Sequence, residues 1–60
     1  MRLVKHDKYG SVLAFTTDEL ATISNALNEA LEKIEAWEFQ TRMGATRAEA
    51  EELLAALGRI

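Results

Sequence analysis

The amino-acid sequence predicts an α+β miniature domain in which an N-terminal β-hairpin precedes a set of helices. Three observations predict it. β-forming residues flank a KYG turn, an apolar stripe recurs at helical spacing from Leu20 to Ile34, and two Thr-x-x-Glu capping boxes mark helix starts. We expect a single domain, 1–60, with a hairpin over 1–16, a long helix over 17–36, a short rotated helical segment over 37–43 and a C-terminal helix over 46–57.

The predicted hairpin comprises RLVKHD and SVLAFTT, two runs that are rich in β-forming side chains. Gly10 lies between them and can adopt positive φ, which favours a tight turn. A two-residue turn at Tyr9 and Gly10 places Val4 opposite Phe15, and we prefer this register. A three-residue turn would place Leu3 opposite Phe15 instead. Two strands alone are not stable in water, so the hairpin needs further contacts.

The long helix begins at TTDEL, where Thr16 and Glu19 have capping-box spacing and Thr17 is the competing N-cap. Apolar side chains then recur three and four residues apart, which predicts an amphipathic helix. This stripe comprises Leu20, Ile23, Leu27, Ala30, Leu31 and Ile34.

The stripe cannot continue unchanged into WEFQTRM. Continued helical rotation would bury the carboxylate of Glu38 and expose Phe39 and Met43, and an unpaired buried charge is costly. We therefore predict a kink or short break between Lys33 and Glu38. After it, Phe39 and Met43 form a new apolar face, and Glu38 pairs with Arg42. The alternative is a continuous helix whose far side a partner covers.

The C-terminal helix has its own start and stop signals. Gly44 is expected to end the preceding segment, and Thr46 with Glu49 forms a second capping box. Gly58 is expected to stop the helix. The apolar stripe of this helix comprises Ala50, Leu53, Leu54 and Leu57.

Small size limits the ways in which this chain can be stabilised. A domain of 60 residues buries only about 60% of its unfolded surface and is marginal alone. The chain has no cysteine and one histidine, His6, so it lacks a disulfide, a thiolate metal site and a histidine pair. Association remains, and we expect a homodimer.

Motifs for chemistry are missing. There is no Gly-rich phosphate loop, nucleophile elbow or zinc-ligand spacing, so we expect no catalytic residue, no metal site, no cofactor and no enzyme activity. The longest apolar run, Val12 to Phe15, is far shorter than the roughly 20 residues that span a bilayer. We therefore expect no membrane segment and a cytoplasmic location.

Large apolar side chains near the predicted break are the main candidates for a contact surface. Trp37, Phe39 and Met43 belong to residue types that are enriched at interface centres. In so small a protein these side chains are also the main candidates for the hydrophobic core, so a core role and an interface role both stay open. The candidate interface set is Trp37, Phe39, Met43, Arg42, Val12 and Phe15.

The leading functional hypothesis is a small protein–protein interaction module, of a regulatory, antitoxin or immunity type. The alternative is a nucleic-acid-linked regulator, in which a dimer pairs two basic hairpins that carry Arg2, Lys5 and Lys8 into a β-ribbon. Residues 1–10 carry a net charge of +2 and residues 18–38 carry −5. TRMGATRAEAEELLAAL also has the spacing of a helix-turn-helix, but its second helix, AEAEELLAAL, would repel a phosphate backbone. We expect a protein partner rather than nucleic acid.

The order of a hairpin, a helix start at TTDEL, NALNE, EFxTRxG and a capped Leu-rich helix resembles a set of short, uncharacterised bacterial proteins. The matching residues are Thr17, Leu20, Asn25 to Glu29, Glu38, Phe39, Thr41, Arg42 and Gly44. The resemblance implies a shared fold over nearly the whole chain and implies no particular activity. In these relatives a loop separates NALNE from EF, whereas ALEKIEAW in this chain has no turn residues.

Overall fold

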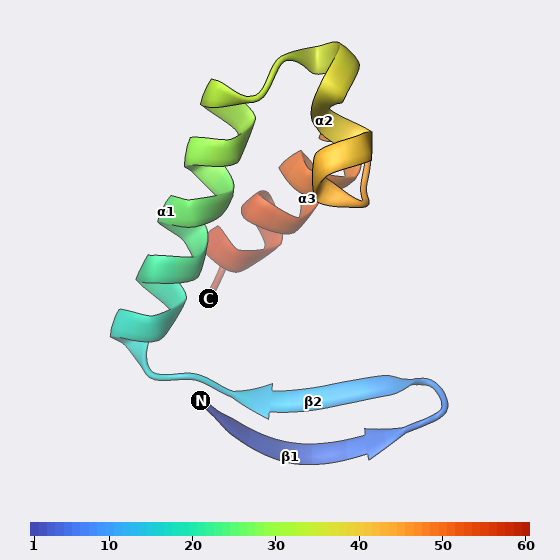
Figure 1. The fold of residues 1–60 in the computed structure, drawn as a ribbon. Helices are drawn as coiled ribbons and strands as arrows, with labels where there is room; N and C mark the ends of the chain where they lie inside the picture. Colours follow the sequence, from blue (N-terminus) through green and yellow to red (C-terminus); the bar gives the residue numbers. More distant parts are fainter.

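The computed structural model describes all 60 residues and shows a two-stranded hairpin followed by three helices (Figure 1). The elements are β1 (Arg2–Asp7), β2 (Gly10–Ala14), α1 (Thr17–Lys33), α2 (Ala36–Met43) and α3 (Arg47–Gly58). This is the α+β architecture that the sequence predicts. No helix combines the length and the apolar character that crossing a membrane requires.

The hairpin turn is one residue earlier than the sequence suggested. Lys8 and Tyr9 form the two-residue turn, and Asp7 lies opposite Gly10. The carboxylate of Asp7 accepts a hydrogen bond from the Tyr9 N–H at 2.9 Å, an Asx-type contact that fixes the turn at this place. Gly10 still has a positive φ of 147°, but it is the first residue of β2 rather than part of the turn.

The strand register therefore differs from both registers considered above. Leu13 lies opposite Leu3, and the register shifts between Leu3 and Lys5, where Val4 is the extra residue of a β-bulge. The predicted pairing of Val4 with Phe15 is wrong, and so is the alternative pairing of Leu3 with Phe15. Phe15 follows the last paired residue of β2.

The predicted break after the long helix is confirmed. α1 ends at Lys33, three residues before the predicted boundary, and α2 begins at Ala36. Ile34 and Glu35 between them have extended backbone, with ψ of 127° and 144°. α2 in turn ends at Met43, and Gly44 follows it with a left-handed φ of 74°, a conformation that suits glycine directly after a helix.

This break gives Glu38 and Phe39 suitable surroundings. Glu38 is half-exposed and accepts a hydrogen bond from Arg42 Nε at 3.0 Å, which is the predicted pair four residues apart. Phe39 turns inward and is only 1% exposed. A continuous helix would have reversed these two environments, so the free energy of burying a charge favours the break.

Both predicted capping boxes are present. The Thr16 hydroxyl accepts from the Glu19 N–H at 3.1 Å, and the Glu19 carboxylate accepts from the Thr16 N–H at 2.9 Å. Thr46 and Glu49 repeat this geometry at the start of α3. Thr16 rather than Thr17 is thus the N-cap of α1.

The end of α3 differs from the prediction. Gly58 is the last residue of the helix rather than the residue that stops it. Arg59 takes the C-cap position with right-handed backbone angles.

Replacing Thr46 with alanine is expected to lower the free energy of unfolding by about 1 kcal/mol, because the Glu49 N–H in the first turn of α3 loses the Thr46 hydroxyl that accepts its hydrogen bond. Urea denaturation followed by circular dichroism would measure the loss. Thr41→Ala, on an exposed position of α2, is the matched control and should show no such loss. Equal midpoints for the two variants would contradict this role of Thr46.

The stabilisation from this cap should also depend on pH. The backbone hydrogen bond from Thr46, followed by that from its side chain, lowers the pKa of the Glu49 carboxyl below its ordinary value of 4.5. A lowered folded-state pKa adds stability above the unfolded-state pKa, and this stability is lost as pH falls through the folded-state value. The free energy of unfolding of the wild type should therefore fall in acid by an amount that Glu49→Gln, which has no titrating carboxyl at this position, does not show.

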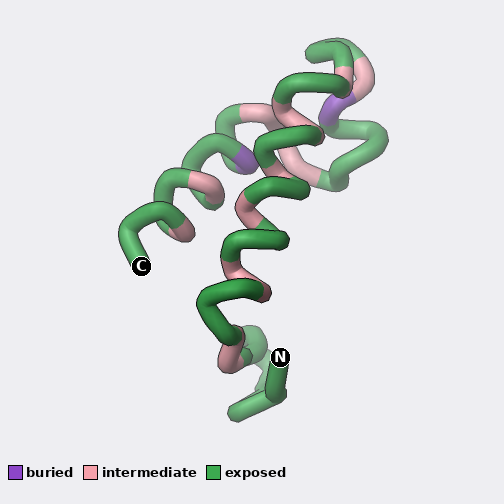
Figure 2. The backbone as a smooth tube through the Cα atoms, turned by 90° about the vertical axis from the view of Figure 1, so that its left-hand side faces the viewer, coloured by how far each residue is buried: buried purple, intermediate pink, exposed green.

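The hydrophobic core is very small. Phe39 on α2 and Ala50 on α3 are the only buried residues. The inner face of α1, which packs on α3, is half-buried (Figure 2). The hairpin extends away from the helices (Figure 1). Every residue of β1 is exposed.

The exposed area of the chain is large for its mass. It is 4972 Å², whereas a compact monomer of 6.7 kDa exposes roughly 3,900 Å². The excess of about 1,000 Å² is comparable to the ~800 Å² that each partner buries in a standard protein–protein interface. The single chain thus leaves about one interface of surface uncovered.

Candidate interaction surface

An apolar groove lies where the three helices meet. It is a hollow of ≈ 280 Å³, and all its lining residues are hydrophobic. They are Ile23, Ala26 and Leu27 from α1, Met43 from the end of α2 and Leu53 from α3. We refer to these five residues as the apolar groove.

Helical spacing explains why these side chains share one surface. Ile23, Ala26 and Leu27 are three and four residues apart and so lie on one face of α1. This face lies beside the half-buried face that packs on α3, and Ile23 remains 38% exposed. On α3, Leu54 points inward and is half-buried, whereas its neighbour Leu53 is 55% exposed. The contact between α1 and α3 is too narrow to cover both Leu53 and Leu54, so Leu53 stays exposed.

A second hollow continues the groove toward the hairpin. It has a volume of ≈ 300 Å³, and Ile23 lines both hollows. Its other lining residues are Met1, Phe15, Glu19 and Thr22. The two hollows together make an apolar strip that runs from Phe15 to Leu53.

Glu19 is the only charged side chain that lines the strip. The amino group of Met1 pairs with the Glu19 carboxylate, and the Thr16 N–H donates to it. These contacts lower the pKa of the Glu19 carboxyl. The carboxylate at this end of the strip is therefore ionised and already partnered at neutral pH.

The structure brings two of the predicted contact residues into this strip. Met43 lines the apolar groove, and Phe15 lines the adjoining hollow. Phe39 lies elsewhere because its ring fills the core of the single chain. The guanidinium of Arg47 covers that ring at 5.4 Å from its centroid. Phe39 is therefore a core residue, and its ring is not part of the exposed surface.

The other predicted contact residues lie outside the strip. Trp37 is 81% exposed on the first turn of α2 and lines none of the hollows. Arg42 is held by Glu38. Val12 belongs to the hairpin, where it is 54% exposed.

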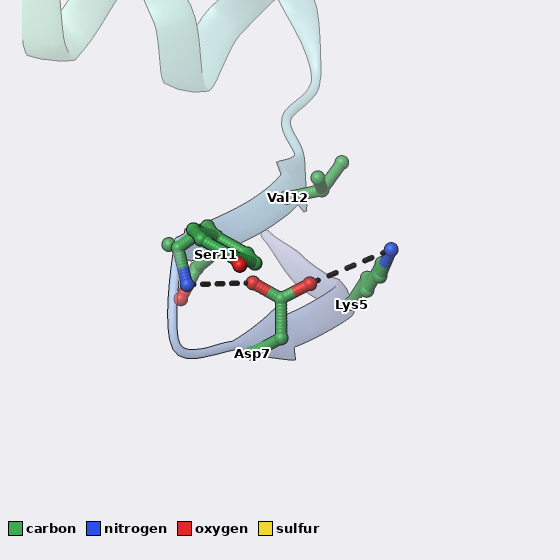
Figure 3. A pocket seen from close by; sticks show the side chains of 6 residues that line it. Lys5, Asp7, Ser11 and Val12 are labelled. Atoms are coloured by element: carbon green, nitrogen blue, oxygen red, sulfur yellow. Dashed lines mark hydrogen bonds and ion pairs between the residues drawn. The ribbon is translucent and has the colours of Figure 1, made fainter.

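The hairpin carries a separate, polar hollow of ≈ 270 Å³ (Figure 3). Asp7 lies at its centre, 3.5 Å from the Lys5 amine, and accepts a hydrogen bond from the Tyr9 N–H. The charges in this hollow are thus already paired within the hairpin. Nowhere in the chain do three carboxylate or imidazole groups gather closely enough to hold a metal ion.

One contact that the sequence analysis missed joins His6 Nδ1 to Ser11 Oγ at 2.6 Å. The two residues face each other across the strands. A serine nucleophile with a histidine base also needs a group that orients the imidazole and a site for the substrate. Here no carboxylate hydrogen-bonds the imidazole, and both side chains are exposed. The geometry suits a cross-strand structural contact.

Three members of the apolar groove, Ile23, Leu27 and Leu53, were predicted as parts of the apolar helix stripes but were not among the predicted contact residues. The sequence did contain a signal for this surface, which is the width of the apolar face on the last helix. Leu53 and Leu54 are consecutive and about 100° apart on the helix, so a short α3 cannot bury both against one neighbour.

Comparison with known proteins gives no match: no family model fits the chain, and no curated protein or solved structure is similar to it. The resemblance to short bacterial proteins therefore stays a prediction.

Proposed function

We propose that this chain is a non-enzymatic protein–protein interaction module that associates as a homodimer through the apolar groove. The observation that carries the proposal is the exposed area, which exceeds that of a compact monomer by about the surface that one interface covers. A small regulatory, antitoxin-like or immunity-like partner is the class of protein that fits this size.

The groove supplies the right chemistry for such an interface. All five of its residues are hydrophobic, and Leu53 and Met43 are respectively 55% and 38% exposed. Interface centres are depleted in charge and enriched in methionine and large apolar side chains. A second copy is the simplest occupant, because the same surface then serves both partners about a two-fold axis.

The nucleic-acid alternative has weaker support. Lys5 is paired with Asp7 at 3.5 Å, and the Lys8 amine lies over the Tyr9 ring at 5.2 Å from its centroid. A carboxylate in the middle of the hairpin also opposes contact with a phosphate backbone. We therefore keep the basic hairpin as an alternative and favour the dimer.

Replacing Leu53 with glutamate is expected to weaken the dimer by at least about tenfold in Kd, because a charge would enter the apolar groove. Sedimentation equilibrium over a range of concentrations would measure the dissociation constants. The wild type should sediment as a dimer at micromolar concentration.

Ala55→Glu is the matched control, because it adds the same charge to an exposed position of α3 outside the groove. This variant should dimerise like the wild type. Circular dichroism would show that both variants keep their helices. A monomeric wild type, or equal dissociation constants for the two variants, would overturn the proposal.

A further inference from the structure

We propose that the two copies of this chain also join their hairpins, by antiparallel pairing of β2 with β2, into one four-stranded sheet. The inference rests on the proposed homodimer and names a second part of its interface. It starts from the hairpin, which packs on no helix and exposes large apolar side chains on both strands. A two-stranded hairpin in water is marginally stable at best, whereas a sheet of three or more strands with an apolar face can be stable.

The outer edge of β1 is protected against such pairing. Arg2 and Lys5 lie on this strand, and a β-bulge interrupts it at Val4. Charged side chains and bulges are the features by which natural edge strands avoid pairing with other chains.

The outer edge of β2 has none of these features. Its sequence, GSVLA, has no charge and no proline, and its residues pair with β1 without a second bulge. The next charged residue along the chain is Asp18. An edge strand without charge, proline or bulge offers its unpaired N–H and C=O groups for pairing with another chain. The two edges of one hairpin therefore differ sharply, and only β2 is open.

The register of the hairpin determines which groups β2 offers. The two-residue turn makes Asp7 and Gly10 a hydrogen-bonded pair, and such pairs alternate with non-hydrogen-bonded ones along antiparallel strands. The N–H and C=O groups of Ser11 and Leu13 therefore point outward. Two β2 strands overlap completely when Val12, the middle residue of β2, lies opposite Val12 of the second copy. Ser11 then hydrogen-bonds with Leu13 of the second copy, and the reverse pair is formed by symmetry.

The charges on β1 are compatible with this arrangement, and they also limit the sheet to four strands. Pairing through β2 places the two β1 strands on the outside, three strand spacings or about 14 Å apart. This separation exceeds the Debye length of about 8 Å at physiological salt, so their lysines hardly repel each other. The new outer edges are both β1, and their charges and bulges prevent further addition. The sheet therefore stops at four strands.

Cysteine cross-linking tests the pairing directly, because the chain has no cysteine of its own. In the proposed sheet, Val12 faces Val12 of the second copy as a non-hydrogen-bonded pair, with Cα atoms about 4.5 Å apart, within the range of a disulfide. Val12→Cys should therefore form a disulfide-linked dimer under mild oxidation. Lys5→Cys is the matched control, because Lys5 is the cross-strand neighbour of Val12 and is also exposed. Two copies of that residue lie about 14 Å apart and cannot be bridged.

A second pair of variants separates the two edges without cysteine chemistry. Ser11→Pro removes an outward N–H from β2, and His6→Pro removes one from β1. Both variants lose the same His6–Ser11 hydrogen bond, and proline is tolerated where the N–H faces outward. Ser11→Pro should weaken the dimer by at least about tenfold in Kd, whereas His6→Pro should change Kd by less than about twofold.

The outcomes distinguish this inference from the proposed function. Selective cross-linking of Val12→Cys, together with selective weakening by Ser11→Pro, would support β2 pairing. A wild type that sediments as a dimer, with equal cross-linking of the two cysteine variants, would overturn β2 pairing alone. The same holds if the two proline variants have equal dissociation constants. A wild type that sediments as a monomer would overturn both proposals.

Discussion

Phe39→Ala is expected to lower the free energy of unfolding by about 3–5 kcal/mol, the largest loss from any single substitution in this chain. Phe39 is the only large side chain that is fully buried, at 1% exposure. A domain of this length has a total stability of roughly 3–9 kcal/mol. The variant should therefore be largely unfolded at room temperature. Far-UV circular dichroism with urea titration, at one fixed protein concentration, would measure the change.

Trp37→Ala provides the control, because it removes a larger aromatic ring from the same helix. Trp37 is 81% exposed, so its removal should cost less than about 0.5 kcal/mol. A helix signal that survives equally in both variants would show that Phe39 is not the centre of the core. Both variants remove an aromatic side chain from α2. The difference between their free energies of unfolding therefore reports the effect of burial.

Local signals in the sequence were sufficient for the N-termini of α1 and α3. Both capping boxes depend on a threonine and a glutamate three residues apart, and such short-range contacts form wherever the backbone turns. The break before α2 was predictable for a different reason. An unbroken helix would have buried Glu38 and exposed Phe39, which is a conflict that the sequence alone reveals.

The hairpin register was not predictable from β-propensity and the position of Gly10. Several two- and three-residue turns within KHDKYGSV are equally compatible with the β-propensities and with the position of Gly10. The deciding contact is the hydrogen bond from the Tyr9 N–H to the Asp7 carboxylate, which selects Lys8 and Tyr9 as the turn. The bulge at Val4 shifted the register again. Each one-residue change moves a strand's side chains to the opposite face, so small local contacts had large effects.

The candidate interaction surface was predicted only in part. Aromatic and methionine content identified Met43, but it favoured Trp37 and Phe39 without telling exposed rings from buried ones. Ile23 and Leu53 were missed because the sequence shows apolar stripes but does not show how much of each stripe a neighbour covers. That coverage depends on the packing of α1 on α3, which joins residues far apart in the chain.

Arg47→Ala should produce the second-largest loss, about 2 kcal/mol, because one side chain links three helices. Its Nη1 donates a hydrogen bond to the Leu31 carbonyl at 2.8 Å, near the C-terminus of α1, and its guanidinium covers the Phe39 ring of α2. A cation in the first turn of α3 is unfavourable for that helix's own dipole, whereas it is favourable at the C-terminal end of α1. The position of Arg47 is therefore explained by its partners on α1 and α2.

Arg42→Ala is the matched control for charge and residue type. Arg42 pairs only with Glu38 on the surface, and exposed pairs of this kind contribute roughly 0.5 kcal/mol or less. Arg47→Lys tests geometry, because lysine keeps the charge but cannot both donate to Leu31 and lie flat on Phe39. Its midpoint in urea should fall between those of Arg47→Ala and the wild type. If Arg47→Ala unfolds at the same urea concentration as Arg42→Ala, the contact with Leu31 and Phe39 does not hold the helices together.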